Sequence, residues 1–465
     1  MNTSLENDDS LIIPELVIKL ADLQKEMESL ISSRYFNSQP VISQTIYKPL
    51  MNIPFFLQDI LLIGALTCSP VLLSGSSGSG KTLLAELVVE FLFGKDGYAR
   101  KNITPDMNEQ DFMDIDFGVI KEGGTLKEAI KPDSLFTKPA VIIDEANRAP
   151  PIVQNRLLQL LENNIDLKSK TIKAGPKLLN NAHYQWNILT LNIGEEYVGT
   201  SAIDRALKDR ISIHIPIDNF PPTLDDQIKM IRYSPIFQEI TPSNTRKQVI
   251  FSIFQNLDKV ILSLEAEAFL LYLSFASNCV KSPTHSKYGV NFSPIYCKEK
   301  DCPYARNPPL NEICPFVFAP SNRALRKVVQ VAKGFSLLRH AKIVQNFQLN
   351  EENGKLSKYL KSYTNWEVTL EDIMAIAPLI LYSKIPMNWE WVLNNFNGNS
   401  YIAIKHFLKI VNTRLNEFME KLLPQLVKEK RGEKLTETDL GKRKQAIKKD
   451  FHFEGLIRYV EKYLR

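Results

Sequence analysis

Apolar residues recur along this chain in two kinds of spacing, and their alternation predicts a layered α/β region. Short apolar runs at residues 71–73, 140–143, 186–191 and 211–217 are typical of buried strands. Stretches with helical spacing lie between them. Because strands and helices alternate over about 170 residues, we expect a parallel sheet with helices on both faces.

Helical spacing dominates the remainder of the chain. Residues 1–10 are polar, and one face of a helix then follows, marked by Leu16, Leu20, Leu23, Met27 and Leu30. Beyond Pro221 the pattern predicts long helices at 224–233, 247–257, 262–280, 324–340 and 370–381.

Shorter features fill the intervals between these elements. Residues 36–50, with two prolines, are interpreted as a linker, and a helix is expected around residues 56–66. The pair Gly123-Gly124 in the polar region 95–138 indicates a hairpin-type turn. Residues 165–177 are expected to form a small hairpin. The segment 150–164 has an amphipathic pattern that predicts a helix.

These patterns divide the chain into four predicted parts. They are an N-terminal tail and helix (1–48), an α/β domain (49–220), a helical domain (221–385) with a cysteine-containing insertion at 281–320, and a helical C-terminal extension (386–465).

The first predicted strand runs into a glycine-rich loop. The spacing Gly75-x-x-x-x-Gly80-Lys81-Thr82, between a strand and a helix, is that of a phosphate-binding loop. Backbone amides and the positive end of the helix would face the phosphates, Lys81 would reach the β- and γ-phosphates, and Thr82 would bind Mg²⁺. The nucleotide-binding residues expected here are Gly75, Ser76, Ser77, Gly78, Ser79, Gly80, Lys81, Thr82 and Leu83.

Polar residues stand at the ends of the next strands. Asp144 and Glu145 follow the second strand, and Asn192 ends the third. Ligands of such sheets bind at the carboxyl ends of the strands, so these side chains can converge with Thr82. Asp144 would then hold Mg²⁺ through a water, Glu145 would polarise the attacking water, and Asn192 would hold that water or a γ-phosphate oxygen.

Three arginines are candidates for contacts with the γ-phosphate. Arg205 and Arg210 precede the fourth strand, from which either could reach the nucleotide of a neighbouring subunit, and we favour Arg210. A surface ion pair is the alternative for Arg205. Arg323, at the start of a helix in the second domain, could reach the γ-phosphate from a lid.

Three segments resemble MoxR-like AAA+ ATPases. VIIDEANRAPPIVQNRLLQLLENN is similar to the Walker B region of that family, LNIGEEYVGTSAIDRALKDRI to its sensor-1 and arginine-finger region, and APSNRALRKVVQVAKGFSLL to its sensor-2 segment. The resemblance spans residues 15–385, apart from the insertion. The loop departs from the family, which often has Pro and Thr among its glycines, and neither the insertion nor the tail has a counterpart.

The resemblance implies an activity and an assembly. It assigns Walker A to Lys81 and Thr82, Walker B to Asp144 and Glu145, sensor 1 to Asn192, the arginine finger to Arg210 and sensor 2 to Arg323. It further implies an ATP-driven homo-oligomeric ring, usually a hexamer, that remodels other proteins, often with a partner carrying a von Willebrand factor A domain. ATP is the expected nucleotide, because the guanine-reading Asn-Lys-x-Asp string is absent.

Four of the five cysteines lie near or within the insertion. Cys279, Cys297, Cys302 and Cys314 could hold Zn²⁺ tetrahedrally, or three of them could do so with His285. Their spacings are looser than those of paired C-x-x-C sites, so free thiols are the alternative. An iron–sulfur cluster is a third interpretation.

Composition narrows the setting and leaves two functional alternatives. The net charge of +5 is too small to argue for nucleic acid, no membrane span is expected, and five cysteines in 465 residues favour a cytoplasmic protein. The basic stretch 428–449 contains interleaved acids typical of a solvated helix, with nucleic-acid binding as the alternative. A nucleic-acid motor and a nucleotide-gated assembly platform therefore stand beside the remodelling ATPase.

Overall fold

The computed structural model divides the chain into two compact units. The first comprises residues 1–261 and 329–367, and the second comprises residues 262–328 and 368–465. The predicted domain boundaries stay predictions. The residues described are 12–47, 50–108, 112, 117–124, 134–167, 170–193, 205–232, 239–276, 320–362, 366–385, 387, 389–431, 433–449 and 453–463.

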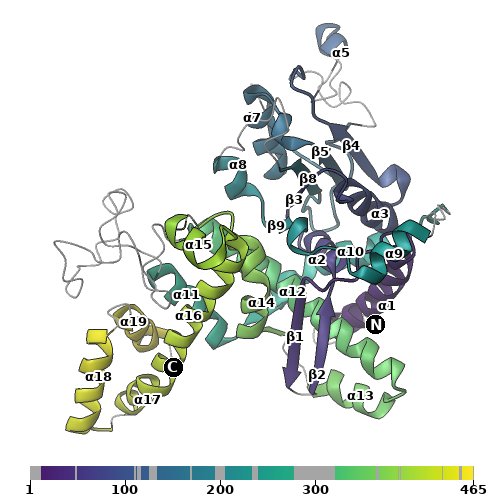
Figure 1. The fold of residues 1–465 in the computed structure, drawn as a ribbon. Helices are drawn as coiled ribbons and strands as arrows, with labels where there is room; N and C mark the ends of the chain where they lie inside the picture. Colours follow the sequence, from purple (N-terminus) through teal and green to yellow (C-terminus); the bar gives the residue numbers. More distant parts are fainter. Residues whose placement is uncertain are drawn as a thin grey trace, which may run out of the picture. The chain divides into compact units, whose positions relative to one another are not determined.

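A parallel five-stranded sheet forms the centre of the first unit (Figure 1), which confirms the predicted α/β fold. Its spatial order is β4 (Tyr98–Asn102), β5 (Ala140–Asp144), β8 (Trp186–Asn192), β3 (Val71–Gly75) and β9 (Ile213–Pro216). Four of these strands match the four apolar runs of the sequence. The fifth, β4, lies at an edge, and its side chains are half-buried or exposed, so no apolar run marks it.

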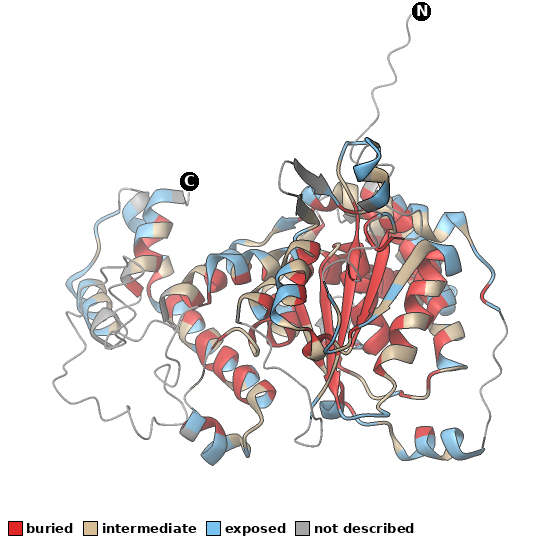
Figure 2. Cartoon of the chain, turned by 90° about the horizontal axis from the view of Figure 1, so that it is seen from above, coloured by how far each residue is buried: buried red, intermediate tan, exposed pale blue. Residues whose placement is uncertain are grey.

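The strand register places the expected functional residues at one edge of the sheet. Gly75 of β3 lies opposite Asn192 of β8, and Asp144 of β5 lies opposite Asn102 of β4. β3 and β5 are buried along their whole length, as the red strands of Figure 2 show. Strands buried on both faces explain why these runs are continuously apolar in the sequence.

Helices cover both faces of this sheet. On one face, Leu72, Val141, Ile143 and Leu189 share a buried core with the apolar side of α7 (Pro151–Leu161), as its amphipathic pattern predicts. The opposite face carries a layer in which α1 (Ile12–Ser32), α2 (Leu57–Leu66), α3 (Lys81–Phe93) and α10 (Asn244–Asn256) pack on one another. The remaining elements of the unit are η2 (Lys95–Gly97), α5 (Phe117–Lys121), η3 (Ala146–Arg148), β6 (Asn164–Leu167), β7 (Lys170–Lys173), α8 (Arg205–Arg210), η4 (Ile217–Asn219), α9 (Leu224–Arg232), η5 (Leu257–Lys259) and α13 (Asn353–Ser362).

Residues 36–50 are not a plain linker, and this prediction was wrong. β1 (Ile42–Tyr47) and β2 (Leu50–Phe55) form an antiparallel pair in which Ile42 lies opposite Phe55. Both of these side chains are buried. Pro40 lies outside the strand pair, so the pair can form despite the breaker residue that suggested a linker.

The Gly123-Gly124 pair ends a helix and does not form a hairpin turn. Gly123 has φ +86°, and the amide of Gly124 donates to the carbonyl of Val119 at 2.8 Å. A left-handed glycine followed by this six-to-one hydrogen bond is a common helix terminus. The same glycine pair suits both structures, so the local sequence did not separate them. The predicted hairpin at 165–177 is confirmed, with β6 and β7 antiparallel.

The second unit is helical, as expected for the later part of the chain. α16 (Ser400–Lys421) packs on α11 (Leu264–Ala276), α14 (Leu370–Leu381), α15 (Trp389–Phe396) and α17 (Leu423–Lys430). The unit also contains the first residues of α12 (Asn322–Leu349), together with α18 (Glu437–Lys449) and α19 (Phe453–Tyr463). Two of the sequence boundaries between the units fall within the two-residue strands β10 (Ile261–Leu262) and β11 (Glu367–Val368). None of the described helices is both long and apolar enough to cross a membrane.

A buried polar network joins three helices of the first unit. The carboxylate of Asp59, at the start of α2, is fully buried and accepts hydrogen bonds from the amide of Phe56 at 2.8 Å and from Nε2 of Gln24 at 2.9 Å. Nζ of Lys342, on α12, lies 2.8 Å from its Oδ2. Because Gln24 belongs to α1, the Asp59 carboxylate links the N-terminal helix α1 to α2 and α12.

Replacement of Asp59 by alanine tests this network. Asp59→Ala removes the buried carboxylate nearest to the Lys342 ammonium and leaves only the more distant Glu28 at 3.7 Å, so we expect a loss of about 3–5 kcal/mol in the free energy of unfolding. Urea unfolding followed by circular dichroism measures this loss. The control is Glu239→Gln, which removes an exposed ion pair with Lys95 and should leave the urea midpoint unchanged. Equal midpoints for the two variants would contradict the assignment.

Candidate functional site

The glycine loop follows β3 and turns into α3. Gly78 and Gly80 have φ +76° and +78°, a region that favours glycine. A Cβ atom at Gly80 would lie 2.8 Å from Cε2 of Tyr35, so the loop packs directly on that ring. Burial raises the pKa of Tyr35 to about 12, which keeps the phenol neutral. Both glycines are therefore needed for the loop's conformation.

Lys81 turns its ammonium onto the loop itself. Nζ donates to the carbonyl oxygens of Gly75 at 3.0 Å and Ser76 at 2.6 Å, and to Oγ of Ser79 at 3.0 Å. Burial lowers the pKa of Lys81, while nearby carboxylates oppose that shift. The ammonium thus lies against two carbonyl oxygens and one hydroxyl of the loop.

Asp218 contacts the same loop from η4. Its Oδ2 accepts from the amide of Ser76 at 2.9 Å, and its Oδ1 accepts from Oγ of Ser76 at 3.0 Å. A Cβ atom at Gly75 would lie 2.8 Å from Oδ1, so glycine is required at that position as well. Asp218 therefore fixes the beginning of the loop against the strand end of β9.

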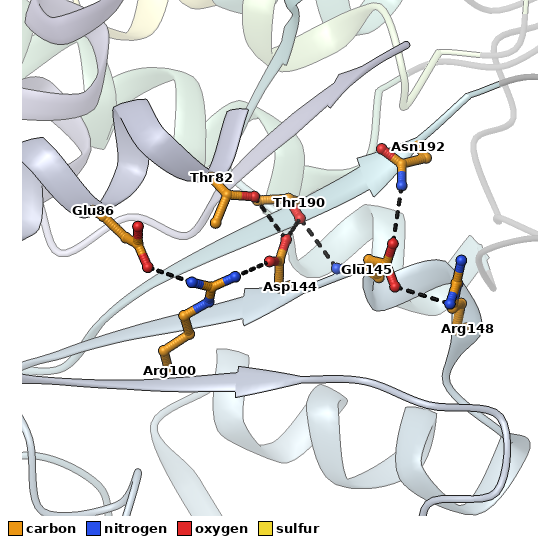
Figure 3. Close-up of polar contacts among 8 residues, drawn as sticks. All are labelled: Thr82, Glu86, Arg100, Asp144, Glu145, Arg148, Thr190 and Asn192. Carbon is orange, nitrogen blue, oxygen red and sulfur yellow. Dashed lines mark hydrogen bonds and ion pairs between the residues drawn. The ribbon is translucent and has the colours of Figure 1, made fainter. Parts of the chain in front are cut away.

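Asp144 is the centre of the site, as Figure 3 shows. Its Oδ1 accepts from Oγ1 of Thr82 at 2.9 Å and also from Oγ1 of Thr190. Its Oδ2 accepts from the guanidinium of Arg100 at 2.7 Å, and Arg100 also pairs with Glu86 at 2.5 Å. Burial alone would raise the pKa of Asp144, but these hydrogen bonds and the Arg100 charge hold it below its usual range. The carboxylate is therefore a fixed anion beside the loop.

Glu145 and Asn192 meet beside this carboxylate. Nδ2 of Asn192 donates to Oε1 of Glu145 at 3.2 Å, and Nη1 of Arg148 lies 3.1 Å from Oε2 (Figure 3). The amide of Glu145 donates to Oγ1 of Thr190 at 3.1 Å. Glu145 has φ +56° and ψ +43°, an uncommon conformation for a residue with a side chain that often marks a functional turn.

The site fits Mg²⁺ by the chemistry of its donors. The Thr82 hydroxyl gives its proton to Asp144, so its lone pairs remain for a hard cation that prefers oxygen. Asp144 is ionised and stands beside it, in reach of a metal-bound water. Thr82 and Asp144 would thus hold the ion that the sequence predicts. In the described parts of the chain, no cluster of three or more His, Cys, Asp or Glu side chains has metal-binding geometry.

Arg210 is not part of this cluster. Nε of Arg210 pairs with Oε1 of Glu162 at 2.9 Å within the same chain. The side chain of Arg205 is not described. Arg323 begins α12 in the second unit. Cys279, Cys297, Cys302, Cys314 and His285 lie outside the described residues, so the zinc prediction stays a prediction.

Four residues of the site were not assigned roles from the sequence. Thr190 precedes Asn192 by two positions, so its side chain lies on the same face of β8, which was an available signal. Arg148 follows Glu145 by three residues, within reach over one helical turn. Arg100 and Asp218 belong to a strand and a turn far away in the sequence, and no local pattern links them to the loop.

Replacing Thr190 by valine tests the hydrogen bonds to Asp144. The variant leaves the Glu145 amide without its acceptor, so we expect a loss of about 1–3 kcal/mol in the free energy of unfolding at pH 7. The pKa of Asp144 is lower in the folded state than in the unfolded state, where it is about 4. The contribution of Asp144 to the free energy of unfolding is therefore complete above about pH 4 and is lost as the pH falls through the folded-state pKa.

The difference between wild type and Thr190→Val should therefore narrow below about pH 4 without vanishing, because the amide contribution does not titrate. Urea unfolding from pH 7 to pH 3 measures it. Thr190→Ser keeps the hydroxyl and serves as the control. A difference that stays constant over this range would show that Thr190 does not lower the pKa of Asp144.

Comparison with known proteins agrees with this geometry. Residues 70–211 match the family described as AAA domain (dynein-related subfamily). A comparison with the curated proteins finds no match. The crystal structure of a "putative ATPase" from Cytophaga hutchinsonii ATCC 33406 is 18% identical, with a TM-score of 0.53, over 86% of this chain and 96% of that one.

A second similar structure is more distant. A full-length MCM homolog from Methanopyrus kandleri is 12% identical over 83% of this chain and 64% of that one, with a TM-score of 0.40, too low to support an argument. The matched segment contains the glycine loop, the Asp144 cluster and Arg210, whereas Tyr35 and Asp218 lie outside it. This chain therefore carries an AAA+ P-loop ATPase domain.

Proposed function

We propose that this chain is a MoxR-like AAA+ ATPase that works as a hexameric ring and uses ATP hydrolysis to remodel or assemble a partner protein. The observation that carries the proposal is the joint placement of Thr82, Asp144, Glu145 and Asn192 at the carboxyl ends of three adjacent parallel strands. If these residues only formed turns, we would not expect direct hydrogen bonds from Thr82 to Asp144 and from Asn192 to Glu145.

Each residue then has a part in phosphoryl transfer, which depends on positioning and charge stabilisation. The loop amides and Lys81 bind the phosphates, and Thr82 with Asp144 holds Mg²⁺. When bound, Mg²⁺ supplies positive charge next to the phosphate oxygens. Glu145 orients the attacking water and accepts its proton, and Asn192 holds the water or a γ-phosphate oxygen. Adenine specificity is part of the proposal.

Arg210 and Arg323 complete the proposal from outside the described cluster. Arg210 would act on the nucleotide of the next subunit, so its ion pair with Glu162 must open when two copies meet. Arg323 would contact the γ-phosphate from the helical unit. Both assignments rest on the resemblance to MoxR-like proteins, as do the ring and a partner with a von Willebrand factor A domain.

The first test separates nucleotide binding from hydrolysis. We expect Lys81→Ala to lose nucleotide binding, because the ammonium is the loop's only side-chain cation toward the phosphates. Glu145→Gln should bind ATP with near wild-type affinity but hydrolyse it at least about 100-fold more slowly. Binding of a fluorescent ATP analogue and release of phosphate measure the two steps. Turnover by Glu145→Gln at the wild-type rate would remove Glu145 as the water-activating residue.

The second test concerns the shared site. Lys81→Ala and Arg210→Ala should each be inactive alone, yet a mixture should regain activity, because mixed interfaces join an intact loop to an intact guanidinium. Phosphate release across a mixing series measures this recovery. Sedimentation with ATP should show the assembly. No recovery, together with a single-subunit mass at every concentration, would contradict the ring.

The alternatives make different predictions in the same assays. A nucleic-acid motor would be stimulated by DNA or RNA, with a steep loss as salt rises. A nucleotide-gated platform would assemble with ATP and hydrolyse it slowly in wild type as well.

A further inference from the structure

We infer that Arg148 restrains Glu145, so that the isolated protein hydrolyses ATP more slowly than its site allows. The inference rests on the proposed role of Glu145 as the residue that activates water. It concerns a contact that lies within one short turn, from Glu145 through η3. Arg148 is in this view a positioning residue.

Both carboxylate oxygens of Glu145 are engaged. Oε1 accepts from Asn192 at 3.2 Å, and Oε2 faces Nη1 of Arg148 at 3.1 Å (Figure 3). A general base must present a lone pair to the proton that it accepts. Of the two partners, Asn192 is neutral, whereas Arg148 engages the other oxygen through a charge-assisted contact, which is the stronger of the two.

The backbone around Glu145 is fixed, so release requires a side-chain movement. The Glu145 amide donates to Thr190 at 3.1 Å, and Nδ2 of Asn147 donates to the carbonyl oxygen of Asn192 at 3.1 Å. The turn closes through the amide of Arg148, which donates to the Glu145 carbonyl at 2.9 Å. These bonds hold the turn to β8. The ion pair between the side chains of Glu145 and Arg148 can open without disturbing the strand ends.

The position of Arg148 permits that opening. Its side chain is 33% exposed and that of Glu145 is 23% exposed, so the pair is in contact with solvent and its energy is small. Pairs of this kind bias a side chain by roughly twofold to fivefold. Arg100 differs from Arg148 in this respect. Arg100 holds Asp144, a residue that must stay in place, whereas Arg148 occupies a carboxylate oxygen that Glu145 needs for the water.

The experiment compares three variants in steady-state ATPase assays with saturating Mg²⁺. Arg148→Gln removes the charge and should raise kcat about twofold to fivefold, with KM for ATP unchanged, since no nucleotide contact is altered. Arg148→Lys keeps the charge and should stay near the wild-type kcat. The matched control is Arg156→Gln on α7, whose guanidinium donates to Gln159 at 2.7 Å and which should leave kcat unchanged.

A double-variant comparison assigns the effect to Glu145. If Arg148 acts through this carboxylate, adding Arg148→Gln to Glu145→Gln should not raise the residual rate. An equal rise in that background would overturn the inference, as would an unchanged or lower kcat in Arg148→Gln alone. Thermal melting and binding of a fluorescent ATP analogue show that each variant is folded.

The two proposals fail separately. Wild-type turnover by Glu145→Gln would contradict the proposed function, whereas an inactive Glu145→Gln with no gain in Arg148→Gln would contradict the restraint alone.

Discussion

The hydrogen bonds around Asp144 are the interaction on which the rest of the site depends. One carboxylate joins the start of α3 through Thr82, the end of β8 through Thr190, and the edge strand β4 through Arg100. Three segments that are distant in sequence are thereby held together beside the glycine loop. Because a buried anion is costly without partners, the surrounding donors and the sheet that presents them support one another.

The sheet explains why such a cluster can form. In a parallel sheet, all carboxyl ends point the same way, and the order β5, β8, β3 places the acidic strand and the loop strand on either side of Asn192. The buried strands fix this edge of the sheet, and the residues with proposed catalytic or binding roles lie at the strand ends and in the segments that follow them. A second carboxylate, Asp218, uses the neighbouring strand β9 to hold the loop's first residues. Asp144 and Asn192 thus project from the ends of the strands β5 and β8.

Much of this arrangement was predictable from the sequence, because the signals were local. The strands at 71–73, 140–143 and 186–191 were marked by apolar runs, and they are followed by the glycine loop with Lys81, by Asp144 and by Asn192, respectively. The strand β4 could not be found in this way, since an edge strand with half-exposed polar side chains has no apolar pattern. Arg100 was missed with it. Gly123 shows the other limit, because a left-handed glycine serves a helix end and a hairpin equally well.

The contact between Tyr35 and Gly80 bears on where this ATPase domain begins as a physical object. The match to the AAA family starts at residue 70. The Tyr35 ring, which lies against the loop, comes from 35 residues earlier. The hydrogen bond from Gln24 of α1 to Asp59 keeps this N-terminal segment in place. A fragment that begins at residue 70 would therefore lack the Tyr35 ring that packs against the glycine loop. We therefore expect the smallest fragment that binds a nucleoside triphosphate to include α1.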